Sequence, residues 1–183
     1  MSHRNRRRGS TLIEFTLVGI PLVFILISIF EVSRGMWIYT TLAHAVKEGN
    51  RFAIVHGNNC TNFPNSCGKR ISDIATVIRD TGAGLVPTDL VNVQFISSTR
   101  SRTLTDLNTC IVSPGTAPCN EFWPGSGPGV TPKDVGANQF AHIEIRAQYR
   151  FRSAIALFWP GAGSGMVFPT FLLPASSRER IQY

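Results

Sequence analysis

The sequence lacks the usual motifs of catalysis and metal binding. Its four histidines form no HxxxH or HExxH pattern and have no cluster of acids beside them. Glycine is plentiful, yet neither GxxxxGK[ST] nor a strand-linked GxGxxG occurs. We therefore expect no catalytic residue, no metal, no cofactor and no small-molecule substrate, which argues against an enzyme.

Acidic residues are scarce: 11 stand against 18 lysines and arginines, for a net charge of +7. Four arginines and no acid precede Gly9, namely Arg4, Arg6, Arg7 and Arg8, so the remainder of the chain carries only +3. A charge of this size is ordinary for a protein surface. The basic composition therefore gives no reason to expect a nucleic-acid partner.

Long apolar runs are also missing, with one exception at Leu12–Phe30, where Glu14 is the only ionisable residue. As a helix this run would be roughly 28 Å long, close to the hydrocarbon thickness of a bilayer. It predicts a single membrane-spanning helix. Because basic flanks stay in the cytoplasm, the arginine-rich end should face inward and the chain after Phe30 should lie outside the cytoplasm.

An ionised carboxylate in hydrocarbon costs a few kcal/mol, about 3 on insertion scales, so Glu14 needs a partner. If the chain is cut after Gly9, Ser10 gains a free amine and Glu14 becomes the fifth residue of the mature protein. That amine and that carboxylate could neutralise each other, within one chain or between packed chains.

A short basic leader ending in Gly9, followed by Ser10-Thr11-Leu12-Ile13-Glu14-Phe15 and an apolar helix, resembles the cleavage site of type IV prepilins. The stretches 14–22, 30–35 and 45–57 are similar to TadE-like minor pilins of Tad (Flp) pili, although Thr16 and Asn50 stand where alanine is more usual. The resemblance implies cleavage by a prepilin peptidase after Gly9 and a role for Glu14 in subunit assembly. It also implies partnership with other pilins and the Tad secretion machinery.

Four cysteines follow the apolar run: Cys60, Cys67, Cys110 and Cys119. Their spacing fits no CxxC motif, and an even number outside the cytoplasm favours disulfides. Three pairings are possible. We prefer Cys60 with Cys67 and Cys110 with Cys119, since each pair brackets a short loop, and reduced buried thiols are the alternative.

The helix should continue beyond the membrane, because no proline occurs from Glu31 to Val55 and Gly57 would end it. Its buried stripe is predicted at three- and four-residue steps: Val32, Met36, Tyr39, Ala43, Val46 and Ala53. Pro21 predicts a kink or a locally melted stretch in the helix. This proline is either one that a membrane helix tolerates or a hinge. Trp37 and Tyr39 suit a membrane-interface belt or packing against the outer domain.

The remaining chain predicts a small α+β domain. A helix is expected over 70–81, strands over 91–95 and 142–152, and an edge strand over 168–175 that residues 176–183 extend. The Gly- and Pro-rich segments 113–136 and 159–165 should be loops, with Phe122, Trp123 and Trp159 folded back onto the domain. Arginines on one face of the strand, Arg146, Arg150 and Arg152, are interleaved with Glu144 and read as a solvated surface.

The predicted fold is thus α+β and pilin-like, a long helix packed on a small antiparallel sheet. Its segments are a cleaved leader at 1–9, an assembly helix at 10–30, an amphipathic continuation at 31–57 and an extracytoplasmic domain at 58–183. The predicted function is a minor pilin or pseudopilin of a Tad pilus, acting in adhesion or biofilm formation and located in the inner membrane or, after assembly, at the cell surface. The alternative is an uncleaved, single-pass anchored periplasmic binding or adhesin module; an ordinary secretion signal, cut near His44, fits less well.

Overall fold

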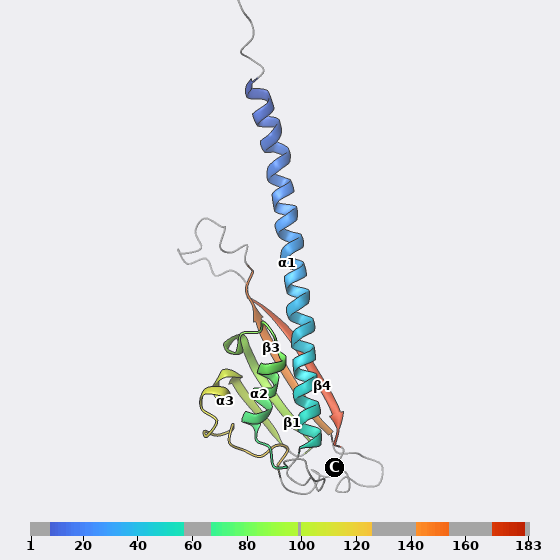
Figure 1. Ribbon diagram of the computed structural model, residues 1–183, viewed down its shortest axis with the longest axis vertical. Helices are drawn as coiled ribbons and strands as arrows, with labels where there is room; N and C mark the ends of the chain where they lie inside the picture. Colours follow the sequence, from blue (N-terminus) through green and yellow to red (C-terminus); the bar gives the residue numbers. More distant parts are fainter. Residues whose placement is uncertain (1–7, 57–66, 99, 126–141, 154–169, 182–183) are drawn as a thin grey trace, which may run out of the picture. The chain divides into compact units, whose positions relative to one another are not determined.

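The computed structural model describes residues 8–56, 67–98, 100–125, 142–153 and 170–181 (Figure 1). The chain divides into two compact units, residues 1–36 with 153–168 and residues 37–152 with 169–183. Each unit is treated by itself below. The α+β fold predicted from the sequence is confirmed, because a long apolar helix is joined to a four-stranded antiparallel sheet.

Helix α1 (Arg8–Val55) is continuous over 48 residues. The absence of proline after Glu31 predicted this length, and the observed end at Val55 lies two residues before Gly57, which was expected to end the helix. Pro21 lies inside the helix and does not interrupt it, so the locally melted stretch is not found. A bend at Pro21 stays a prediction.

The second unit contains an antiparallel sheet in the order β2-β1-β3-β4. Its strands are β1 (Leu90–Ser97), β2 (Ser101–Asp106), β3 (His142–Phe151) and β4 (Phe171–Arg180). The alternation predicted for β3 is confirmed, because every odd-numbered side chain from Ile143 to Phe151 is buried. One face of the sheet therefore carries the core and the other carries polar side chains.

Strand β4 lies at the edge of the sheet, as its prolines predicted, with Pro174 paired in register with Gln148. Residues 168 and 169, where this strand was expected to begin, lie outside the described residues. Strand β2 was not predicted. Its only buried apolar residue is Leu104, so an exposed edge strand leaves almost no alternating pattern in the sequence.

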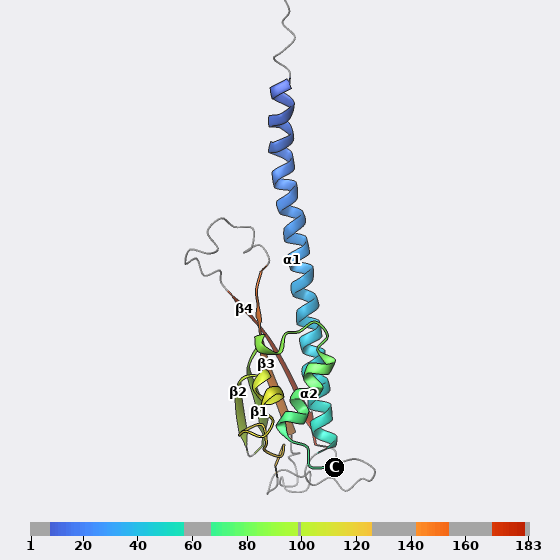
Figure 2. The same cartoon turned by 60° about the vertical axis from the view of Figure 1, so that its left-hand side comes forward.

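Helix α2 (Ile71–Thr81) and the last turns of α1 lie on the same side of the sheet (Figures 1 and 2). The sequence predicted this helix from an apolar stripe of Ile71, Ile74, Val77 and Ile78; the three isoleucines are fully buried, whereas Val77 is half-buried. The Arg70 backbone N–H donates to the Asp73 carboxylate at 2.8 Å, which fixes the start of the helix.

The buried face of α1 differs from the predicted stripe. Four of the six predicted positions, Val32, Met36, Tyr39 and Ala43, are exposed. The observed buried face consists of Ile38, Leu42, Ala45, Val46, Gly49, Asn50, Ala53 and Ile54. This part of α1 is apolar on more than one side, so the spacing fitted two faces and the position of the sheet decided between them.

Gly49 and Asn50 lie where α1 meets the rest of the domain. A Cβ atom at Gly49 would lie 2.5 Å from Cγ1 of Ile78, so only glycine permits this approach of α1 to α2. The Asn50 amide donates to the backbone oxygen of Ser177 at 3.1 Å and to that of Ile143 at 3.4 Å. Asn50 therefore connects α1 to both β3 and β4.

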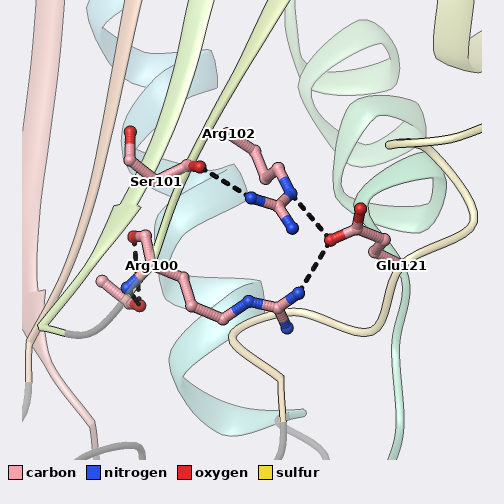
Figure 3. Close-up of polar contacts among 5 residues, drawn as sticks. Arg100, Ser101, Arg102 and Glu121 are labelled. Carbon is pink, nitrogen blue, oxygen red and sulfur yellow. Dashed lines mark hydrogen bonds and ion pairs between the residues drawn. The ribbon is translucent and has the colours of Figure 1, made fainter.

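A cluster of three charged side chains ties the segment after the short helix α3 (Asn108–Val112) to the sheet (Figure 3). Glu121 accepts hydrogen bonds from Arg100 at 3.0 Å and from Arg102 at 2.8 Å. Next to it, Trp123 is fully buried and packs edge-on against Phe95. The prediction that aromatic residues of this loop fold back is thus confirmed for Trp123, whereas Phe122 is 44% exposed and lies under the Arg70 guanidinium. Trp159 and residues 126–136 and 159–165 lie outside the described residues.

Candidate functional site

The apolar segment of α1 is the first candidate site. Thirteen large apolar side chains between Leu12 and Phe30 are exposed, by 52% to 76%. Helix α1 is long and apolar enough to cross a membrane, and none of the residues in its most apolar 18-residue stretch is buried. A helix belonging to the core of a soluble domain would be covered, so this segment needs lipid or other chains around it.

Three hydroxyl groups in and just after this segment are satisfied within the helix. The hydroxyls of Thr16, Ser28 and Ser33 donate to backbone carbonyls three or four residues earlier, at 2.8 to 2.9 Å. Thr16, which departs from the usual alanine, therefore adds no unpaired donor. Glu31 and Arg34 form an ion pair of 3.8 Å one residue after the apolar run ends.

Gly9, Ser10 and Glu14 lie on the same helix, α1. Ser10 and Glu14 are four positions apart, which places them on one helical face. The side chain of Glu14 is exposed. A cut after Gly9 would place a positive amine one helical turn from this carboxylate. Residues 1–7 of the proposed leader lie outside the described residues.

An apolar hollow of about 340 Å³ follows this part of the helix, lined by Phe15, Thr16, Gly19, Ile20, Val23 and Phe24. Gly19, which has no side chain, is part of its lining. Small residues let neighbouring membrane helices approach closely, and a bulky residue such as Phe15 can supply the matching ridge. The hollow therefore gives the exposed apolar helix a place for side-by-side packing.

Cys110 and Cys119 form a disulfide with their Cα atoms 5.1 Å apart, the pairing preferred from the sequence. Both cysteines are buried, Cys110 on α3 and Cys119 in the segment that follows it. Cys67 is also disulfide-bonded, and Cys60, the partner we prefer for it, lies outside the described residues.

Two of the three described histidines make local contacts, and His44 is exposed. His56 approaches the Phe52 carbonyl at 3.0 Å and stacks on the Phe52 ring, and His142 contacts Arg178 at 2.9 Å. Among the residues that the structure describes, no three His, Cys, Asp or Glu side chains come together in a way that could hold a metal ion.

The arginines on and just after β3 are partly neutralised. Arg146 donates to Glu144 at 2.6 Å and Arg152 to Asp89 at 3.2 Å. The hydrogen bond from Arg146 is the largest cause that lowers the pKa of Glu144, and the positive charges of Arg146, Arg178 and His142 add to it while burial opposes it. Glu144 is thus an anion on the polar face of the sheet.

Sequence reasoning missed the role of Asn50. Its side chain is fully buried and its amide nitrogen reaches Ser177 and Ile143, while its oxygen has no hydrogen-bond partner among the residues that the structure describes. The only signal was its departure from the usual alanine. A polar residue at a buried helical position implies a partner, but the sequence does not say which strand supplies it.

Residues 9–51 match the family model described as TadE-like protein. This part of the chain is TadE-like. The match includes Gly9, Ser10, Glu14 and the apolar run, and it extends along α1 to Arg51, so the family resemblance stated from the residues is confirmed. It relates the protein to Tad pili. The comparisons with curated proteins and with solved structures each found no match.

Proposed function

We propose that this TadE-like protein is a minor pilin or pseudopilin that takes part in assembling a Tad (Flp) pilus for adhesion or biofilm formation. A prepilin peptidase cuts the chain after Gly9, and the product then packs with other pilins in contact with the Tad secretion machinery. The observation that carries the proposal is the continuous helix α1, which has Gly9 and Ser10 at its start and Glu14 within the exposed apolar part that follows.

The same apolar surface serves two settings. Before assembly it faces the lipid of the inner membrane, with the arginine-rich end in the cytoplasm and the sheet domain in the periplasm. After assembly it packs against other apolar helices, which are no less apolar than lipid, so transfer between the two costs little hydrophobic free energy. Close packing then depends on shape, which the hollow at Gly19 supplies.

Cleavage also alters the electrostatics of Glu14. In the uncut chain α1 starts at Arg8, and Glu14 lies beyond its first turn. After the cut, the helix starts at Ser10 with a positive amine, and Glu14 lies one turn away. A carboxylate near a helix N-terminus is stabilised by about 0.3–1 kcal/mol at an exposed position, and more where water is excluded. The match to an amine, in the same chain or a neighbour, offsets the cost of placing Glu14 in lipid.

The first test is mass spectrometry of the protein isolated from its host membranes. We expect a mature chain that begins at Ser10, and an uncut chain in a strain without the prepilin peptidase. A native protein that keeps Met1, or that begins near His44, would rule out the pilin proposal. Retention of Met1 would favour the alternative, an uncleaved anchored binding or adhesin module.

The second test is the substitution Glu14→Ala. We expect normal amounts in the membrane fraction and a strong loss of pili in sheared surface fractions, because the amine would lose its partner. Ser28→Ala is the matched control, since it removes a hydroxyl of the same segment that bonds to the backbone of its own helix and lies outside the hollow, and it should leave piliation unchanged. Normal piliation with Glu14→Ala would contradict the assembly role.

A further inference from the structure

The sheet of the second unit has two hollows that meet at Asn92. The first measures about 660 Å³ and the second about 400 Å³, and Asn92 lines both. Polar side chains dominate the first: Asn92, Gln94, Glu144, Arg146, Gln148 and Ser176. The second adds Thr88, Thr105, Asp106 and Arg150. Together they follow β3 from Glu144 to Arg150, a length on the order of 20 Å.

A β-bulge brings Asn92 into this position. The pairing of β1 with β3 passes from Val91–Gln148 to Gln94–Arg146, so β1 carries one residue more than its partner. Asn92 has φ +51°, a left-handed conformation that asparagine tolerates better than most residues, and its side chain is exposed. Bulges of this kind redirect a side chain, here between the two hollows.

Several polar atoms along the two hollows remain available. The Asn92 amide donates to Gln148 Oε1 at 2.9 Å, which leaves the Asn92 oxygen and the Gln148 amide nitrogen without a further recorded partner among the described residues. Glu144 uses one oxygen to accept from Arg146. Arg150 has no recorded ion pair within the described part of the chain. The surface thus offers donors and acceptors side by side.

The charges along the two hollows nearly cancel, because Arg146 and Arg150 stand against Glu144 and Asp106. The phosphate backbone of a nucleic acid would lie beside two carboxylates, so electrostatic attraction would add little to its binding free energy. A protein partner would be expected to bury a cluster of large apolar anchors, and the first hollow is mostly polar. An uncharged polymer with many hydroxyl groups fits better, since each hydroxyl both donates and accepts, as do the amides of Asn92, Gln94 and Gln148.

We propose that this surface binds a neutral linear polysaccharide along β3. Amide groups at Asn92, Gln94 and Gln148, together with the Glu144–Arg146 pair, bind the sugar hydroxyls. Tyr39, which is 49% exposed and also lines the first hollow, provides an aromatic surface for a sugar ring. This binding role goes beyond pilus assembly, and it does not depend on whether the chain is cleaved.

The test is titration calorimetry of the full-length protein in lipid nanodiscs with cellohexaose and chitohexaose, with a hexameric oligouronate and a DNA oligonucleotide as comparison ligands. We expect at least one neutral hexasaccharide to bind. The variants are Asn92→Gly, which removes the amide but keeps the left-handed backbone, and Gln148→Ala. Each should weaken binding by roughly fivefold, the equivalent of one lost hydrogen bond. Ser101→Ala, on the exposed edge strand β2 and outside both hollows, is the matched control and should leave the affinity unchanged.

Thermal unfolding of each variant shows whether the fold is kept. Gln148 is on the polar face of β3, so Gln148→Ala should leave the core intact. It therefore tests the proposal even if Asn92→Gly disturbs the fold. Absence of binding to both neutral hexasaccharides at millimolar concentration would overturn the proposal. Binding of the oligouronate or the DNA alone would overturn it too, as would affinities that neither Asn92→Gly nor Gln148→Ala changes.

Discussion

Asn50 provides the sharpest test of how α1 joins the sheet domain. The substitution Asn50→Asp keeps the shape of the side chain but replaces the amide donor with an oxygen. That oxygen would face the backbone oxygens of Ser177 and Ile143, which the Asn50 amide contacts at 3.1 and 3.4 Å. Since Asn50 is fully buried, water cannot separate these groups.

The expected cost has two parts. Losing two long hydrogen bonds costs about 1 kcal/mol each, and burying a carboxylate whose nearest donor is the Ser177 hydroxyl, 3.3 Å from the Asn50 amide nitrogen, costs roughly 1–3 kcal/mol more. We therefore expect the free energy of unfolding of the second unit to fall by about 3–5 kcal/mol at neutral pH. This loss is a large fraction of the stability of a domain of this size.

The pH dependence has a definite sign. Burial among carbonyl oxygens raises the pKa of the new aspartic acid in the folded state, so the folded form stays protonated while the unfolded form ionises. Below the unfolded pKa of about 3.9 the ionisation cost is absent, and above it the cost grows by about 1.4 kcal/mol per pH unit until the folded pKa is reached. The variant should therefore lose less stability at low pH.

The assay is urea unfolding of the full-length protein in detergent, followed by tryptophan fluorescence and near-UV circular dichroism from pH 4 to 8. Asn92→Asp is the matched control, because Asn92 is exposed and the Gln148 amide can turn to donate to the new carboxylate. The control should change stability by less than about 1 kcal/mol. A cost for Asn50→Asp no greater than that of the control, or one that does not depend on pH, would refute the packing of α1 on β3 and β4.

Two further predictions concern the sheet domain. Replacing Cys110 and Cys119 by serine should lower the free energy of unfolding by about 2.5 kcal/mol through the entropy of the opened loop, measured by urea unfolding without reductant; an unchanged midpoint would mean that this disulfide adds no stability. Arg146→Gln should raise the pKa of Glu144 toward its ordinary value, measured by NMR titration of the side-chain carboxyl carbon, because the largest cause of its lowering is removed. Because the pKa of Glu144 is lower in the folded state, its ionised carboxylate stabilises the fold above the unfolded pKa, and this stabilisation is lost as pH falls through the folded pKa. The variant should therefore be less stable at pH 7 but not near pH 3. An unchanged Glu144 pKa would contradict the role of the hydrogen bond.

Local patterns determined much of this fold. The length of α1 followed from the absence of proline after Glu31, and β3 followed from strict alternation, because these signals depend only on neighbouring residues. The TadE-like segment was recognisable for a similar reason, since Gly9, Ser10 and Glu14 lie close together in the sequence. Strand β2 escaped prediction because an exposed edge strand buries too few side chains to leave a pattern.

Contacts between distant residues were decided only by the tertiary structure. The face that α1 buries depends on where the sheet lies, and spacing alone selected Val32 and Met36 in place of Ile38 and Leu42. Asn50 reaches a strand 127 positions later, and the hollows at Asn92 require β1, β3 and β4 to assemble around a bulge. A sequence specifies which side chains have to be buried or paired, but the partner is set by packing, which is a property of the whole domain.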